Sequence, residues 1–219
     1  MATILCLETA TTNCSVALSI NGEVRAIKEE NNQKYSHAEK LHVFIDEVLK
    51  EAKVDKNGLD AIAVSKGPGS YTGLRIGISA VKGLCFALDI PLISTLTLEI
   101  LAQQVKNEDC YIISLLDARR MEVYSAVFNS EKKQIRETKA EILEENLFED
   151  FLKVRKTIFI GDGASKFGVI CNHENAVFIN DAFPSSKDMA TLAEAKYKIS
   201  DTEDVAYFEP FYLKEFMLG

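Results

Sequence analysis

The sequence predicts an α/β protein built from two duplicated subdomains, each with roughly the element order βββαβα. Three observations support this prediction. Apolar and alternating runs of strand length recur along the chain, separated by longer stretches with helical periodicity. The order of these runs is roughly the same in residues 1–106 and in residues 107–219. The first strand of each half also ends in an acidic residue, Glu8 in the first half and Asp117 in the second.

The first predicted subdomain, residues 1–106, begins with three strands and continues with alternating helices and strands. Asn21 and Gly22 are the preferred pair of a type I′ turn, so they predict a hairpin between the second and third strands. Ser36 and Glu39 form a capping box, which predicts the start of the first helix. The expected strands are 3–7, 14–20, 23–29, 59–65 and 91–94, and the expected helices are a segment from Ser36 to Ala52, 73–88 and 96–105.

The second predicted subdomain, residues 107–219, repeats this order. A turn at 161–163 leads into a short helical stretch, and the tail 207–219 is aromatic and apolar. Because such a tail is more stable when it packs on the protein than when it is free, we expect it to dock back. The expected strands are 111–116, 121–128, 134–140, 157–160 and 176–179, and the expected helices are 145–153 and 186–199.

The composition is typical of a folded protein that binds nucleic acid only weakly by itself. Apolar residues make up 47% of the chain, which is enough to form a core. The net charge of −8 opposes phosphate binding, so we expect any contact with nucleic acid to be indirect. There is neither a membrane-length apolar run nor the basic start of a signal peptide, which predicts a cytoplasmic protein. The five cysteines contain no C-x-x-C pair and predict neither disulfides nor a zinc site.

The most specific stretch of the sequence, residues 66–77, is a glycine-rich turn between a strand and a helix. Ser70 or Thr72 can cap the helix that follows. The turn matches neither a phosphate-binding P-loop, since Lys66 precedes the glycines, nor a nucleophile elbow, since Pro68 occupies the first glycine position. Anion binding at the helix start and a purely structural turn both remain open.

The helix after this turn carries small residues on one arc at helical spacing. Each glycine inside a helix costs about 1 kcal/mol relative to alanine. Close approach of another helix would offset this cost, and that helix can belong to the same chain or to another subunit. If it belongs to another subunit, a large side chain at Gly77 or Ala80 should break subunit association and leave the chain folded. The small residues of this arc are Gly73, Gly77, Ala80, Gly83 and Ala87.

Four segments together resemble the TsaB family. The segment at 67–77, GPGSYTGLRIG, is the most specific of them. In the first strand, Glu8 replaces the aspartate usual in the family, and near the end Lys214 replaces an arginine. The other similar segments are ILCLETA at 4–10 with SVAL at 15–18, LDARRMEVY at 116–124 and PFYLK at 210–214. The matches span the chain.

The resemblance implies an actin-like ATPase fold, which belongs to the ribonuclease H-like class. It implies a non-catalytic scaffold and activator that binds TsaD, the catalytic subunit, with the ATPase TsaE joining them. The complex transfers a threonylcarbamoyl group to adenosine 37 of tRNA, which this subunit would contact only indirectly. Members also form homodimers through helices of the first subdomain. The partner and dimer surface is therefore expected at Gly69, Ser70, Tyr71, Thr72, Gly73, Arg75, Ile76, Gly77, Ala80, Gly83, Ala87, His37 and Leu41.

Catalysis by the chain alone has little support in the sequence. TsaD holds its metal with an H-x-x-x-H pair, whereas His37 and His42 are five residues apart and point about 140° from each other on a helix. We expect no metal site and no resident cofactor, apart from ADP or ATP at an interface with TsaD. An autonomous actin-like ATPase or kinase is the alternative, and a metalloprotease, which an older name of the family suggests, is less favoured. A vestigial nucleotide site would involve Glu8, Thr9, Asp117, Gly161 and Gly163.

Overall fold

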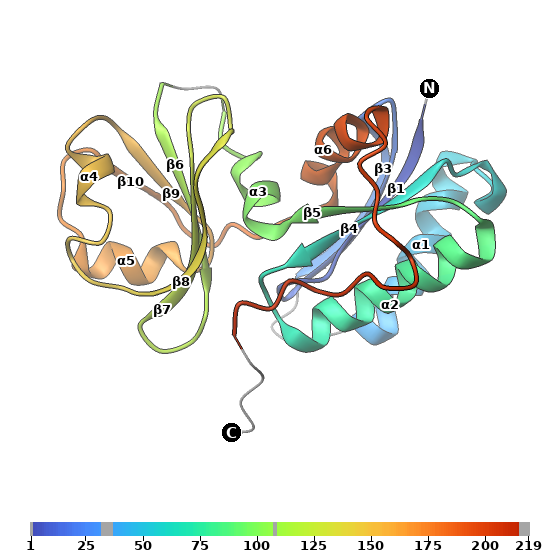
Figure 1. Cartoon of the computed structure of the whole chain (residues 1–219), viewed down its shortest axis with the longest axis horizontal. Coiled ribbons are helices and arrows are strands. Elements are labelled where there is room, and N and C mark those ends of the chain that lie inside the picture. Colours follow the sequence, from blue (N-terminus) through green and yellow to red (C-terminus); the bar gives the residue numbers. More distant parts are fainter. Residues whose placement is uncertain (1, 32–36, 107–108, 215–219) are drawn as a thin grey trace. The chain divides into compact units, whose positions relative to one another are not determined.

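The computed structural model describes residues 2–31, 37–106 and 109–214 and divides the chain into two compact units (Figure 1). Unit 1 comprises Met1–Ile100 and Pro184–Tyr212, and unit 2 comprises Leu101–Phe183 and Leu213–Gly219. Each unit is built around one five-stranded mixed sheet. Within the described residues, none of the helices combines the length and the apolar composition needed to cross a membrane.

The sheet of unit 1 has the order β3-β2-β1-β4-β5. The first three strands are antiparallel neighbours, and β4 and β5 continue from β1 in parallel. The predicted hairpin between β2 and β3 is confirmed, because Asn21 and Gly22 have φ angles of 54° and 77°. The strands are β1 (Thr3–Glu8), β2 (Asn13–Ile20), β3 (Glu23–Asn31), β4 (Ala61–Gly67) and β5 (Leu92–Leu96). The helices are α1 (His37–Ala52), η1 (Lys56–Gly58), α2 (Tyr71–Leu88) and α3 (Thr97–Ala102).

Both faces of this sheet are covered, so its central strand is apolar throughout. Successive side chains of a strand point to opposite faces. Leu5 and Leu7 of β1 pack in the cluster that includes α1 and α2. Ile4 and Cys6 pack in a second cluster, on the other face, with Met189 of α6 (Ser186–Lys198). The first strand is therefore held between two helical layers.

The sheet of unit 2 repeats the topology of the first, with the order β10-β9-β6-β7-β8. Again the first strand of the unit is central, antiparallel to its hairpin partner and parallel to the later strand beside it. This confirms the duplicated α/β fold that the sequence predicts. The elements are β6 (Tyr111–Asp117), β7 (Glu122–Phe128), β8 (Gln134–Ile142), α4 (Glu149–Leu152), β9 (Thr157–Ile160), α5 (Ala164–Ile170) and β10 (Ala176–Ile179).

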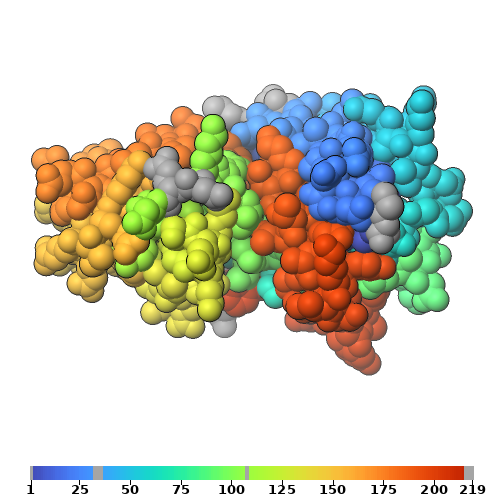
Figure 2. All heavy atoms as spheres, turned by 90° about the horizontal axis from the view of Figure 1, so that it is seen from above, coloured from blue at the N-terminus to red at the C-terminus, as the bar shows by residue number. Residues whose placement is uncertain are grey.

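The last helix, α6, lies in the second half of the sequence but packs in unit 1. It packs on β1, β2 and β5, and Figure 2 shows the orange and red surface of α6 and the following segment against the blue strands. The compact units therefore differ from the contiguous halves 1–106 and 107–219 that the sequence predicts. The physical reason is that α6 covers the face of the first sheet that α1 and α2 leave open.

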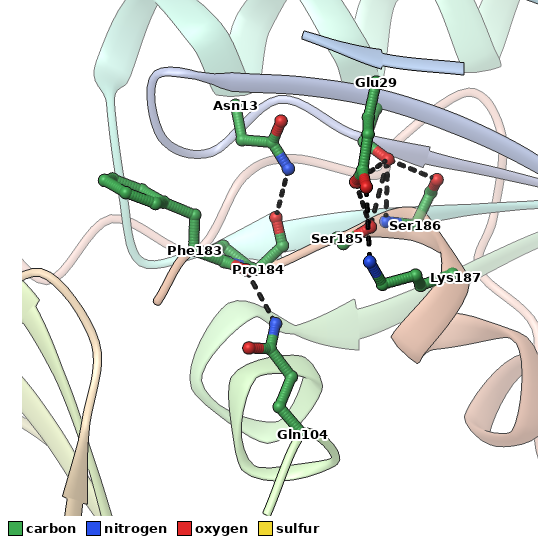
Figure 3. Close-up of polar contacts among 9 residues, drawn as sticks. Asn13, Glu29, Gln104, Phe183, Pro184, Ser185, Ser186 and Lys187 are labelled. Atoms are coloured by element: carbon green, nitrogen blue, oxygen red, sulfur yellow. Dashed lines mark hydrogen bonds and ion pairs between the residues drawn. The ribbon is translucent and has the colours of Figure 1, made fainter. Parts of the chain in front are cut away.

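A polar network fixes the start of α6 to unit 1 (Figure 3). Ser186 is bonded to Ser15 through its hydroxyl at 2.6 Å and through its backbone N–H at 3.1 Å. Ser185 donates to the Glu29 carboxylate at 2.6 Å, and the Lys187 ammonium lies 3.2 Å from the same carboxylate. These donors hold the pKa of Glu29 below its ordinary value although burial acts in the opposite direction. Such long-range polar contacts leave no periodic pattern in the sequence.

Two predicted helices are shorter in the structure. The segment 145–153 is helical only over Glu149–Leu152, because the residues before it close tight turns, with Leu147 N–H donating to Glu144 C=O at 3.1 Å. The segment 96–105 is helical over Thr97–Ala102 and then turns. Ser36 of the predicted capping box lies outside the described residues.

Candidate functional site

The glycine-rich turn leads from β4 into α2, and Ser70 caps the helix. The Ser70 hydroxyl accepts a hydrogen bond from Gly73 N–H at 3.2 Å, which satisfies one free donor of the first turn. Ser70 N–H in turn donates to Ala10 C=O at 2.6 Å. Thr72, the other candidate for the cap, is exposed on the first turn. The turn is thus tied to the loop between β1 and β2.

Three glycines allow this loop to lie directly against α2. A Cβ atom added at Gly69 would lie 2.3 Å from Ala10 O, one at Gly73 would lie 2.1 Å from Thr9 O, and one at Gly77 would lie 2.2 Å from Thr9 Oγ1. Thr9 Oγ1 also donates to Gly73 C=O at 2.8 Å. The close approach that the small residues indicate is therefore made by the chain's own loop.

This contact corrects the expected role of Gly73 and Gly77. Both are buried inside unit 1 and cannot present a surface to a partner. A large side chain at Gly77 would disturb the fold itself, contrary to the expectation from the sequence. Glycine tolerates such close backbone contact because it has no Cβ.

The other half of the α2 arc faces outward. Gly83 and Ala87 are exposed, and a Cβ added at Gly83 would meet nothing within 4 Å. Phe86 lies between them with 84% of its surface exposed. The set expected from the sequence omits Phe86, although an aromatic residue beside a polar helical strip is a recognisable signal. The exposed strip of α2, hereafter the α2 strip, consists of Thr72, Arg75, Ser79, Gly83, Phe86 and Ala87.

The C-terminal segment runs along α2 and covers the start of this strip. The rings of Tyr71 and Tyr212 lie 4.8 Å apart, and Arg75 both stacks over Tyr71 and donates to the Tyr212 hydroxyl at 3.1 Å. Phe208 is buried in the core of unit 1. Within the tail 207–219, Phe208 and Tyr212 therefore pack on unit 1, and residues 215–219 lie outside the described part of the chain.

The remaining residues of the expected partner surface are either fully buried or half-buried. Leu41 is fully buried in the core, and His37 is 1% exposed with Nε2 at 2.8 Å from Thr11 O. Both are thus internal residues, contrary to the expectation of a surface role. Their pattern on α1 could not distinguish a core face from a partner face. Gly69, Ser70, Tyr71, Ile76 and Ala80 are half-buried.

The three histidines are dispersed. His37 is buried at the start of α1, His42 is exposed on the same helix, and the ring of His173 accepts from Asn175 N–H at 3.1 Å in unit 2. Among the described residues, no group of three or more His, Cys, Asp and Glu side chains is arranged to hold a metal ion.

Glu8 ends β1 in a fully buried position. Its Oε1 accepts from Ala10 N–H and from the Ser65 hydroxyl, both at 2.7 Å, while Oε2 has no hydrogen-bond partner among the described residues. Burial raises the pKa of this carboxyl from 4.5 to about 7. Glu8 thus holds the loop whose Thr9 and Ala10 carbonyls lie against Gly73 and Gly69.

We expect Glu8 to make the stability of the chain depend on pH. Because the pKa of Glu8 is raised on folding, its contribution to the free energy of unfolding is fully present below about pH 4.5. That contribution is lost as pH rises through about 7. The shift corresponds to about 3 kcal/mol, as an order of magnitude. Urea unfolding of the wild type and of Glu8→Gln between pH 4.5 and 8 should show a difference that grows with pH. A constant difference would contradict the buried carboxyl.

The acid of the second unit has a different environment. Asp117 is exposed, and its carboxylate accepts from the Lys166 ammonium and from Arg119 N–H, both at 2.6 Å. Gly161 has a φ of 126°, and a Cβ there would lie 2.1 Å from Leu115 O. A Cβ at Gly163 would lie 3.0 Å from Val123 Cγ1. The glycines of this turn thus serve its close packing on the neighbouring strands, and nucleotide binding there stays a prediction.

Comparison with known proteins identifies related families. The family model of TsaD, tRNA N6-adenosine threonylcarbamoyltransferase, matches residues 28–214. The tRNA threonylcarbamoyladenosine biosynthesis protein TsaB of Haemophilus influenzae is 30% identical, with 97% of this chain and 93% of the relative covered. A tRNA N6-adenosine threonylcarbamoyltransferase of Bacillus thuringiensis is 36% identical over 105 residues, which cover 41% of this chain and 31% of that protein.

Solved structures with a similar fold include a relative that matches almost the whole chain. YeaZ from Pseudomonas aeruginosa superposes with a TM-score of 0.84 at 29% identity, covering 97% of this chain and 100% of that one. The activator of the 2-hydroxyisocaproyl-CoA dehydratase from Clostridium difficile, solved with bound ADPNP, has a TM-score of 0.52 at 11% identity, with 91% and 97% covered. At that identity the likeness concerns the fold alone, which is the actin-like ATPase fold.

Proposed function

Because the chain belongs to the TsaB family and takes part in tRNA threonylcarbamoyladenosine biosynthesis, we propose that it acts there as a non-catalytic subunit that binds a TsaD-type catalytic partner. In this role the chain is a scaffold and activator of the partner, and a TsaE-type ATPase joins the complex. The tRNA is bound mainly by the partner, in agreement with the net charge of −8. We place the complex in the cytoplasm.

The observation that carries the proposal is the α2 strip. Phe86 is almost fully exposed on a helix whose neighbouring residues, Gly83 and Ala87, are too small to cover it. Aromatic residues are enriched in protein interfaces relative to the rest of the surface. Because the TsaD family model matches most of this chain, partner and chain share a fold. Two chains of one fold can pair through the same patch about a pseudo-twofold axis, and two copies of this chain can pair in the same way when TsaD is absent.

The arrangement of acids and histidines supports a non-catalytic role. Glu8 is enclosed by the loop that it holds, and Asp117 is engaged by Lys166. The isolated chain is proposed to have no resident cofactor. ADP or ATP would bind only at an interface with the TsaD-type subunit. An autonomous ATPase or kinase is the alternative, and turnover of ATP by the chain alone would favour it.

Reconstitution tests the proposal directly. An unmodified tRNA transcript is incubated with threonylcarbamoyl-adenylate and the TsaD-type and TsaE-type subunits, with and without this chain, and modified adenosine is measured. We expect modification only when the chain is present, and no ATP hydrolysis by the chain alone. Equal modification without the chain would refute the proposed role.

A further inference from the structure

The turn between β6 and β7 contains two successive arginines in an unfavourable backbone conformation. Arg119 and Arg120 have φ angles of 70° and 50°. Residues with a Cβ are strained in this left-handed region, and glycine and asparagine are the residues that adopt it readily. The chain itself uses Asn21 and Gly22 for the corresponding angles in the β2–β3 hairpin. Among the described residues, the arginines form the one successive pair in this region without a glycine.

Neighbouring residues of unit 2 brace the turn from both sides. Asp117 accepts from Arg119 N–H at 2.6 Å, and Lys166 donates to Arg120 C=O while it pairs with Asp117 at 2.6 Å. Asp117 N–H in turn donates to Asp162 Oδ1 at 2.8 Å. Asp117, the acid at the end of β6, therefore holds the arginine turn in place. Strain that the surroundings maintain in this way is typical of functional positions.

The two guanidinium groups are available to a ligand. Both residues are exposed, and neither side chain has a hydrogen-bond or ion-pair partner among the described residues. The acids beside the turn are already engaged, since Asp117 pairs with Lys166 and Glu122 pairs with Lys214. The turn therefore presents two exposed guanidinium groups on a chain whose net charge is −8.

We propose that the Arg119–Arg120 turn is a phosphate-contact site for the backbone of a nucleic acid. Guanidinium groups bind phosphate oxygens through paired hydrogen bonds. A small nucleotide is usually bound in a concave pocket, whereas an exposed turn suits contact with an extended backbone. Two contacts position an RNA without binding it tightly, in agreement with the acidic charge of the chain. The inference rests on the proposed function, which makes tRNA the RNA of the complex.

The test uses the assembled complex of this chain with the TsaD-type and TsaE-type subunits, and an unmodified tRNA transcript as the probe. The double variant Arg119→Asn/Arg120→Gly removes both charges and relieves the backbone strain. We expect about 10-fold weaker binding near 150 mM salt, and a log–log salt slope reduced by about 2, one for each lost phosphate contact. The charge-preserving variant Arg119→Lys/Arg120→Lys should keep the slope.

The thermal midpoint separates a binding role from a structural one. Asparagine and glycine favour the left-handed conformation, so the midpoint of the double variant should not fall. Unchanged RNA affinity and slope would overturn the inference. Weaker binding accompanied by a lower midpoint or by loss of the TsaD-type subunit would also overturn it. If modification still requires the chain while the variant binds RNA normally, only this inference fails, whereas modification without the chain refutes the proposed function.

Discussion

Replacing Gly73 by alanine is expected to lower the free energy of unfolding by about 3 kcal/mol, a large effect for the addition of one methyl group. The new Cβ would lie 2.1 Å from Thr9 O, a backbone atom of the loop that Glu8 holds. Relief of the clash requires either the loop or the whole helix to move, and both are tied to the core. The gain in helix propensity, up to about 1 kcal/mol, offsets only part of this cost.

Gly83 of the same helix provides the matched control. A Cβ at Gly83 would meet nothing within 4 Å, so Gly83→Ala should raise the free energy of unfolding by about 0.5–1 kcal/mol. Urea unfolding of both variants measures this contrast. The glycine-to-alanine change should lower the free energy of unfolding at position 73 and raise it at position 83. Equal effects of the two substitutions would mean that the loop does not contact Gly73.

The contrast between these glycines illustrates what the sequence could predict about the site. Small residues at helical spacing indicate that something approaches α2 closely, and this interpretation was right for Gly73 and Gly77. The sequence suggested another helix, whereas the structure has the loop at Thr9. Spacing along a helix defines an arc, but the segment that packs on the arc is set by long-range topology, which no local pattern records.

The same distinction holds for the fold. The succession of strands and helices along the chain and the hairpin at Asn21 follow from local signals, and both were predicted. The attachment of α6 to the first sheet combines apolar packing with a hydrogen bond between Ser186 and Ser15, which is distant in sequence. Burial of His37 and Leu41 likewise depends on the sheet beneath α1. The strained turn at Arg119 could not be recognised either, since backbone angles are not visible in residue types.

Replacing Phe86 by lysine is expected to weaken association with the TsaD-type subunit by about 2 kcal/mol or more, roughly 30-fold in the dissociation constant. Phe86 is the large apolar side chain of the α2 strip, and a buried lysine there would lose its hydration without a partner. Folding should be unaffected, because the side chain is exposed and lysine is favourable near the C-terminus of a helix. Titration calorimetry measures the association.

Val169→Lys is the matched control for this substitution. Val169 is 86% exposed near the end of α5, so the same charge is introduced at a comparable helical position in unit 2. We expect normal association for the control and, in the reconstituted reaction, a loss of modified adenosine for Phe86→Lys alone. Normal association of Phe86→Lys would remove the α2 strip from the interface. Because Tyr212 already covers Arg75 and Tyr71, the partner would then have to displace the C-terminal segment or bind elsewhere on unit 1.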